Sequence, residues 1–413
     1  MREVILTAVI AMVMQIQGSV LMAEERPKVQ PAQASAPSQF DGRISRAVLE
    51  RYLSRAITMR AVSHSAQREE DIRMLKNVGA KFIGRAACQW GNGGDDEHFR
   101  KCQETAELIH QADPDILLEA CVFEAVNEGA NNVSIPVWVF EEFRLKPQQR
   151  NFRYDAMLYD GGKFRNRWRP GWSVPDMSKL ETRMWFFYHA RRYIDAGYEA
   201  LHLGQVHIMD QNDLGHKHWN DMLTHVRAYA AKHARRHLVL CNAHTHGIVE
   251  NGKLLFDFHC WPVRVKEVVG SPQKGILEAT TAYEYGKVDA IYGRSKGGQT
   301  PSGWKCEHLP YIVELDNWGS SSKGGQAIGP CWVWGYDDIC WFARQPVAYR
   351  NEWLRYAWNW VREHDPNGWL EMPGQRRLAD PVDGVDAYYA NTKSEAAPQG
   401  YGQEETIKAI WAK

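Results

Sequence analysis

The sequence has 413 residues, of which 50 are basic and 50 are acidic, so the formal net charge at pH 7 is zero. This balance gives no general attraction to nucleic acid or to an anionic membrane surface, and the length suits one barrel domain of roughly 250 to 400 residues. The 17 Trp and 17 Tyr residues supply flat, amphipathic side chains that suit the faces of small ring compounds as well as a protein core.

The N-terminus has the pattern of a secretory signal peptide. Arg2 precedes an apolar run over residues 4–14, and Ala23 offers a small residue for cleavage. The apolar run is short for a membrane span, although an uncleaved anchor is the alternative. We therefore predict a signal peptide over 1–23, a secreted or periplasmic protein, and no membrane association after cleavage. Residues 24–39 are rich in Pro, Ala, Gln and Ser, which predicts a flexible linker.

From residue 40 onward, apolar strand-like runs alternate with segments of helical periodicity. The strands are predicted at 57–64, 81–90, 115–126, 199–209, 237–246, 254–262, 310–318 and 368–373. The helices are predicted at 69–78, 95–111, 177–196, 216–236, 263–282 and 346–364. This alternation predicts an α/β fold, a (β/α)8 TIM barrel over 40–380 with a C-terminal extension over 381–413. A doubly wound sheet is the alternative, but no glycine-rich phosphate turn follows the first strand.

A long segment over 127–175 interrupts this alternation after the third strand. It contains Tyr, Trp, Arg and Gly with little periodicity. Because long connections in compact domains are often functional, we expect this insertion to lie over one end of the barrel as a lid or subsite wall.

The run 311–319 carries two carboxylates within an apolar strand. Successive strand residues face opposite sides, so Glu314 and Asp316 point the same way. A buried carboxylate without a partner costs several kcal/mol, roughly enough to favour its protonation. This pair therefore indicates a functional site.

Other predicted strands also carry polar residues at matched depth. With one side-chain parity applied to each strand, the residues expected inside the barrel are Arg60, His64, Arg85, Gln89, Glu119, Gln205, His207, Asn242, His244, Asp257, His259, Glu314 and Asp316. Trp90, Asp210 and Trp318 follow strand ends and are expected at the rim. A barrel interior is normally filled by Val, Ile and Leu, so we predict a site at its C-terminal mouth.

Two structural alternatives accompany this ring of polar residues. Arg60 and Arg85 could neutralise Glu119 and Glu314 as buried ion pairs. The third strand could also have the opposite parity, with Glu124 facing inward.

Paired carboxylates, tryptophans at the rim and many neutral hydrogen-bonding groups resemble a barrel glycoside hydrolase. Such enzymes use one protonated carboxyl to protonate the leaving oxygen and one ionised carboxylate as nucleophile or base. The resemblance implies Glu314 as nucleophile or base, with Asp316 tuning or replacing it. It implies Glu119 as the proton donor and Asp210 as its reserve. In the best-known clan an Asn–Glu pair ends the fourth strand, whereas here Asn127-Glu128 follows the third.

The other candidates would bind a carbohydrate substrate, and no cofactor is expected. They are Arg60, His64, Arg85, Gln89, Trp90, Gln205, His207, Asn242, His244, His259 and Trp318. Arg60 and Arg85 could hold a carboxylate or sulfate of an acidic glycan.

Two further classes of protein remain open at this point. His207, His244 and His259 lie on consecutive strands, and with Asp316 they could hold a divalent metal in a metal-dependent hydrolase, or serve a polysaccharide lyase. A non-catalytic glycan-binding barrel is the alternative outside the enzymes.

Overall fold

The computed structural model describes residues 40–91, 95–268, 271–279, 290–291, 294–316 and 338–412. The predicted signal peptide over 1–23, the linker over 24–39 and Trp318 lie outside these ranges. Within these ranges, no helix is both long enough and apolar enough to span a bilayer.

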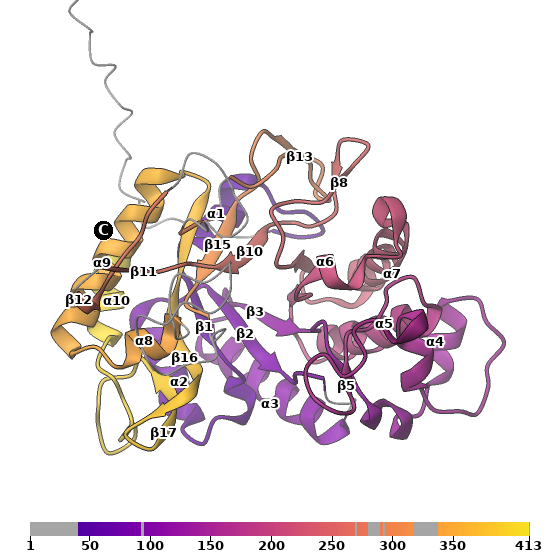
Figure 1. Cartoon of the computed structure of the whole chain (residues 1–413), viewed down its shortest axis with the longest axis horizontal. Coiled ribbons are helices and arrows are strands. Elements are labelled where there is room, and N and C mark those ends of the chain that lie inside the picture. Colours follow the sequence, from indigo (N-terminus) through magenta and orange to yellow (C-terminus); the bar gives the residue numbers. More distant parts are fainter. Residues whose placement is uncertain are drawn as a thin grey trace, which may run out of the picture. The chain divides into compact units, whose positions relative to one another are not determined.

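Eight parallel strands form a nearly closed barrel (Figure 1). In chain order they are β1 (Ala56–Met59), β2 (Phe82–Cys88), β3 (Leu117–Cys121), β6 (Ala200–His202), β7 (Leu240–Asn242), β10 (His259–Pro262), β15 (Tyr311–Glu314) and β16 (Gly368–Val382). They pair in the order β10-β15-β16-β1-β2-β3-β6-β7, and a parallel bridge between His244 and Cys260 joins the two ends of this order. Each strand overlaps one of the predicted runs, so the predicted TIM-barrel fold is confirmed.

Helices lie around the strands and form most of the connections between them (Figure 1). They are α2 (Arg68–Val78), α3 (Asp96–Ala112), α5 (Leu180–Asp195), α7 (Lys217–His233), α8 (Asp338–Ala343) and α9 (Val347–His364). Helix α2 shows the local reasons: acidic residues occupy its first turn, where they favour the helix dipole, and Gly79 ends it in the left-handed conformation.

The predicted helix over 263–282 is wrong. Strands β11 (Lys266–Val268) and β12 (Ser271–Ile276) pair antiparallel in this region. Pro272 and Gly275 both oppose a helix, because proline lacks the backbone donor and glycine loses the most backbone entropy.

The connection after β3 contains short elements. Strand β4 (Val126–Asn127) pairs antiparallel with β5 (Trp172–Ser173), and α4 (Val137–Glu142) lies between them in sequence. The lid role of 127–175 stays a prediction. The other short elements are α1 (Arg46–Leu53), α6 (Val206–Met209), β8 (Val249–Glu250), β9 (Lys253–Leu254), β13 (Gly298–Gln299), β14 (Lys305–Cys306), β17 (Val385–Tyr389) and α10 (Glu404–Trp411).

The barrel interior changes from apolar to polar along the strands. An apolar cluster fills the N-terminal end, where residues of α1 pack against the strand residues Ala56, Phe82, Leu117, Ala200, Leu240, Phe258, Cys260 and Ile312. Two residues further along several strands, the interior positions are occupied by Glu119, His202, Asn242 and Glu314. The apolar end therefore supports the polar end, which is where barrel enzymes carry their sites.

Candidate functional site

A pocket of about 420 Å³ lies at the C-terminal mouth of the barrel. It is lined by Arg60, Arg85, Cys88, Trp90, Phe123, Glu124, Trp168, Gln205, His244, Asp316, Arg376 and Arg377. Most of these residues lie at or just beyond the C-terminal ends of barrel strands, or late in β2 and β16. The predicted residues that reach this pocket are Arg60, Arg85, Trp90, Gln205, His244 and Asp316.

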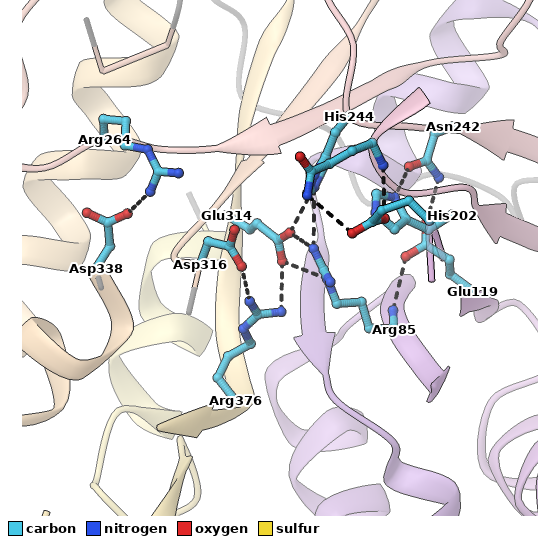
Figure 2. Close-up of polar contacts among 12 residues, drawn as sticks. Arg85, Glu119, His202, Asn242, His244, Arg264, Glu314, Asp316, Asp338 and Arg376 are labelled. Atoms are coloured by element: carbon cyan, nitrogen blue, oxygen red, sulfur yellow. Dashed lines mark hydrogen bonds and ion pairs between the residues drawn. The ribbon is translucent and has the colours of Figure 1, made fainter. Parts of the chain in front are cut away.

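A buried cluster of charges lies under the pocket (Figure 2). Glu314 is fully buried; Arg85 Nε donates to its Oε2 at 3.0 Å, and Arg376 Nη1 donates to the same oxygen at 3.1 Å. A second nitrogen of Arg85 contacts the other carboxylate oxygen. Arg376 Nη2 also donates to Asp316 Oδ1 at 2.7 Å. Of the ion pairs proposed from sequence, the one between Arg85 and Glu314 is therefore present, whereas Arg60 forms no ion pair with Glu119 in the described part of the chain.

The two arginines keep Glu314 ionised. Burial alone would raise the pKa of Glu314, but the positive charges of Arg85 and Arg376 outweigh burial and hold this pKa well below its usual range. Because Arg376 contacts both Glu314 and Asp316, it couples the closed cluster to a carboxylate that reaches the pocket.

Backbone irregularities bring both arginines inward. The pairing of β2 with β3 shifts register between Ile83 and Ala87, and Arg85 has a φ of 54°. The pairing of β1 with β16 shifts between Thr58 and Met59, which changes the parity of β16 before Arg376. Such bulges redirect side chains, and counting alternate residues in the sequence does not reveal them.

A second network surrounds Glu119 (Figure 2). Its Oε1 accepts from Asn242 Nδ2 at 2.6 Å, and its Oε2 accepts from the backbone N–H of Arg85 at 3.0 Å. Burial raises the pKa of Glu119 to about 7, against the opposing effect of these hydrogen bonds. Asn242 Oδ1 lies 2.8 Å from His202 Nδ1. Since the amide nitrogen faces Glu119, we assign the His202 proton to Nδ1, which leaves a lone pair on Nε2.

Glu371 is a third buried carboxyl in the barrel and was not predicted. It is the Cα partner of Glu314 in the pairing of β15 with β16. A Cβ on Gly84 would lie 1.9 Å from Glu371 Oε1, so only glycine leaves room for this carboxyl. Burial, aided by the charges of Glu314 and Glu119, raises the pKa of Glu371 well above its usual range. The signal that could have identified it is an acidic residue inside the predicted strand over 368–373, the same signal that identified Glu314.

Glu124, three residues after the end of β3, is a carboxylate that reaches the pocket. Its Oε2 accepts from the backbone N–H of Gln205 at 3.0 Å, and its Oε1 accepts from Gln205 Nε2 at 3.2 Å. A Cβ on Gly204 would lie 1.9 Å from Glu124 Oε2, and this glycine has a φ of 65°. The predicted parity of the third strand is therefore right, with Glu119 inside the barrel, whereas Glu124 reaches the pocket from the segment after β3, where strand alternation has ended.

Several predicted residues lie away from the pocket. The ring of His64 stacks on His98 with a centroid distance of 5.0 Å, and Asp210 pairs with His216 at 3.3 Å. Gln89 is not among the residues that line the pocket. His207 is exposed on α6, because β6 ends at His202 and strand alternation ends with it.

The parity predicted for the sixth strand is wrong. Phe258 and Cys260 belong to the apolar cluster inside the barrel, so Asp257 and His259 face the other side of β10. Asp257 accepts from Arg227 at 3.0 Å, and His259 Nδ1 lies 2.5 Å from Ser295 Oγ. A one-residue error in register reversed both assignments.

The possible metal ligands that lie close together are not the set suggested by the sequence, which was His207, His244, His259 and Asp316. Among the described residues, ligand atoms of His202, His244 and Cys260 lie within 4.8 Å of one another. Imidazole and thiolate ligands suit zinc and similar transition metals. Burial raises the pKa of Cys260, so metal binding would have to displace the thiol proton.

Unpredicted residues complete the pocket wall. Trp168 comes from the long connection after β3, and its ring lies 5.2 Å from that of Trp90, centroid to centroid. Trp90 also stacks on Trp172 at 5.5 Å. Trp168 therefore shows that this connection contributes to the pocket.

Comparison with known proteins returns glycoside hydrolases among solved structures. A maltogenic alpha-amylase from Thermotoga neapolitana is 10% identical, with 51% of this chain and 50% of that chain covered and a TM-score of 0.33. An alpha-galactosidase from Thermus thermophilus is 14% identical, with 50% and 39% covered and a TM-score of 0.31. A putative alpha-N-acetylgalactosaminidase from Bacillus halodurans is 8% identical, with 48% and 50% covered and a TM-score of 0.30.

This chain thus spans about half the length, or less, of the structures that it matches. No family model matches the sequence, and no curated protein matches it. The chemistry of the pocket must therefore indicate the function.

Proposed function

We propose that the protein is a glycoside hydrolase that cleaves a poly- or oligosaccharide, with Asp316 and Glu124 as the carboxylates that contact the substrate. The observation that carries this proposal is that both carboxylates line one pocket. Asp316 lies just beyond the end of β15 and Glu124 just beyond the end of β3, and these two strands are on opposite sides of the barrel in the strand order. Glycosidic cleavage requires two carboxyl groups on either side of the scissile bond.

The environments of the two carboxylates suit different roles. Arg376 holds Asp316 in a charge-assisted hydrogen bond, which fits a carboxylate that attacks the sugar or activates water. Glu124 accepts only amide hydrogen bonds, and no basic side chain of the described ranges pairs with it, which fits a proton donor. Glu314 and Glu119 are closed off from the pocket by their partners, so we move the roles first proposed for them to Asp316 and Glu124.

The tryptophans of the pocket support a carbohydrate as the substrate. Trp90 is 37% exposed, and its ring forms one wall with that of Trp168. Large apolar ring faces with a polar N–H at one edge can contact the C–H face of a sugar while a hydroxyl group accepts a hydrogen bond.

Release of reducing sugar from a panel of glycans tests this proposal. Asp316→Asn and Glu124→Gln should each lower the rate by roughly 10²- to 10⁴-fold, because each removes acid–base or nucleophilic chemistry. Glu395→Gln, at an exposed position, is the matched control and should retain the activity. Full activity in both Asp316→Asn and Glu124→Gln would reject these two residues as the catalytic carboxylates, and Glu314 and Glu119 would again be the candidates.

Metal-dependent chemistry is the second candidate. His202 Nε2 is buried without a hydrogen-bond partner in the described ranges, and its lone pair belongs to the group formed with His244 and Cys260. A divalent metal held there would act as a Lewis acid. Metal analysis and chelation separate the candidates: cleavage that survives chelation supports the carboxylate mechanism, and cleavage that is lost with the metal supports the second.

Two further outcomes identify the remaining classes. A polysaccharide lyase would release unsaturated sugars, which absorb ultraviolet light, whereas a hydrolase releases saturated ones. A glycan-binding barrel would bind sugars with no release of product.

We also propose that the protein is exported, and the apolar run over 4–14 supports this. N-terminal sequencing of protein from the secreted or periplasmic fraction should begin at Glu24. Recovery of residues 1–23 on the mature protein would contradict the proposal.

A further inference from the structure

The pocket holds more basic than acidic side chains. Four arginines line it, against the carboxylates of Glu124 and Asp316. Two of these arginines, Arg85 and Arg376, are paired with Glu314 and Asp316. In the described part of the chain, the side chains of the other two, Arg60 and Arg377, make no hydrogen bond or ion pair.

The fold places these two arginines close to a third positive charge. The backbone N–H of Arg60 donates to Gln375 O at 2.9 Å, so Arg60 lies next to the segment that carries Arg376 and Arg377. The register shift between β1 and β16 turns Arg376 to the same side as Arg60. Because Arg60, Arg376 and Arg377 all line the pocket, their positive charges favour a negatively charged group there.

The arginines of the pocket also act on a neighbouring thiol. Cys88, the last residue of β2, lines the pocket, and its pKa is lowered to about 7. The largest cause is the hydrogen bond with Cys121, and the charges of Arg60, Arg85 and Arg376 add to it. Negative charge placed at this wall is therefore stabilised by Arg60 as well as by the two paired arginines.

We propose that Arg60 and Arg377 form an anion subsite, and that the sugar bound in the pocket carries a carboxylate or sulfate group. This inference rests on the proposed function, because the subsite borders the same pocket as Asp316. The guanidinium fork matches both oxyanions and can donate two hydrogen bonds to either. Glu124, which follows β3 across the barrel, would contact the uncharged part of the substrate.

Calorimetric binding of three sugars to the intact protein tests the subsite. D-glucuronate probes the carboxylate, D-glucose 6-sulfate probes the sulfate, and D-glucose is the neutral control. We expect at least one charged sugar to bind more tightly than D-glucose, with an affinity that falls as salt is added. Arg60→Gln and Arg377→Gln should each weaken binding of that charged sugar by roughly tenfold or more and leave D-glucose binding unchanged.

Matched variants separate the lost contact from a damaged fold. Arg43→Gln removes an exposed arginine that precedes α1 and does not line the pocket, and it should bind all three sugars as the wild type does. Arg60→Lys keeps the charge but loses the fork and should give an intermediate affinity. Thermal melting of each variant checks that it is folded.

The outcomes distinguish this inference from the proposed function. Equal affinity for all three sugars, no binding of either charged sugar, or full affinity in both arginine variants would overturn the subsite. If neutral glycans are nevertheless cleaved, and Asp316→Asn abolishes the cleavage, the hydrolase proposal stands without the subsite. Charge-selective binding that depends on Arg60 and Arg377 supports the subsite, even if no glycan is cleaved and the hydrolase proposal fails.

Discussion

Replacing Glu119 with glutamine should remove part of the pH dependence of folding. Glu119 is 3% exposed and has a pKa of about 7 in the folded protein, against an ordinary value of 4.5. An acid whose pKa is raised by folding destabilises the protein when it is ionised. The penalty is absent below about pH 4.5, grows as the pH rises towards 7, and is complete above it.

The magnitude follows from the two pKa values. At about 1.4 kcal/mol per pH unit, the full penalty is about 3 kcal/mol, of which about 2.5 kcal/mol develops between pH 5 and pH 8. Glutamine does not titrate, so Glu119→Gln should lose this fall in the free energy of unfolding. The amide N–H₂ of the new glutamine will face another donor, either Asn242 Nδ2 or the Arg85 N–H, so one hydrogen bond is lost. The free-energy cost of this lost hydrogen bond does not depend on pH.

Urea unfolding at pH 5 and pH 8 measures the effect. The difference in unfolding free energy between the two pH values should be smaller in Glu119→Gln than in the wild type by about 2 to 3 kcal/mol. Glu395→Gln, with an exposed carboxyl, should behave as the wild type. An unchanged pH dependence in Glu119→Gln would refute the conclusion that burial holds this carboxyl near pH 7.

Three further predictions concern the cluster and the pocket wall. Glu314→Gln should lower the free energy of unfolding by roughly 3 to 5 kcal/mol in urea titrations, because it leaves Arg85 and Arg376 buried without their shared anion; a loss under 1 kcal/mol would show that water solvates both arginines. The rate of alkylation of Cys88 should reach half its maximum near pH 7 in the wild type and at a higher pH in Arg60→Gln, and Cys88→Ser shows which part of the alkylation comes from Cys88. Equal pH profiles of alkylation in the wild type and Arg60→Gln would exclude the Arg60 charge as a cause of the lowered pKa. Trp168→Ala should weaken binding of neutral sugars, measured by calorimetry, by roughly tenfold, and Trp369→Ala, outside the pocket lining, is the comparison for lost packing.

Strand alternation was a sufficient guide where a strand is regular. Asn242 on β7 and Glu314 on β15 lie inside the barrel as predicted, and His244 and Asp316, two residues further along, line the pocket. On β10 the predicted assignment was wrong, because Phe258 and Cys260 face the interior where Asp257 and His259 were expected. The polar residues Asp257 and His259 share one parity, but they face outward, where Arg227 and Ser295 are their partners, so polarity alone does not identify the interior side of this strand.

The sequence by itself determined the barrel, the position of its strands and the end at which polar residues gather, because these follow from local periodicity and from the two-residue repeat of a strand. Tertiary structure decided which carboxylates reach the pocket. Arg85 and Arg376 enter the interior at bulges, Glu371 needs the space left by Gly84, and these contacts join strands that are distant in the chain. Burial, pKa values and the choice between Glu314 and Asp316 depend on such contacts, because each is the sum of interactions with neighbours that only the closed barrel brings together.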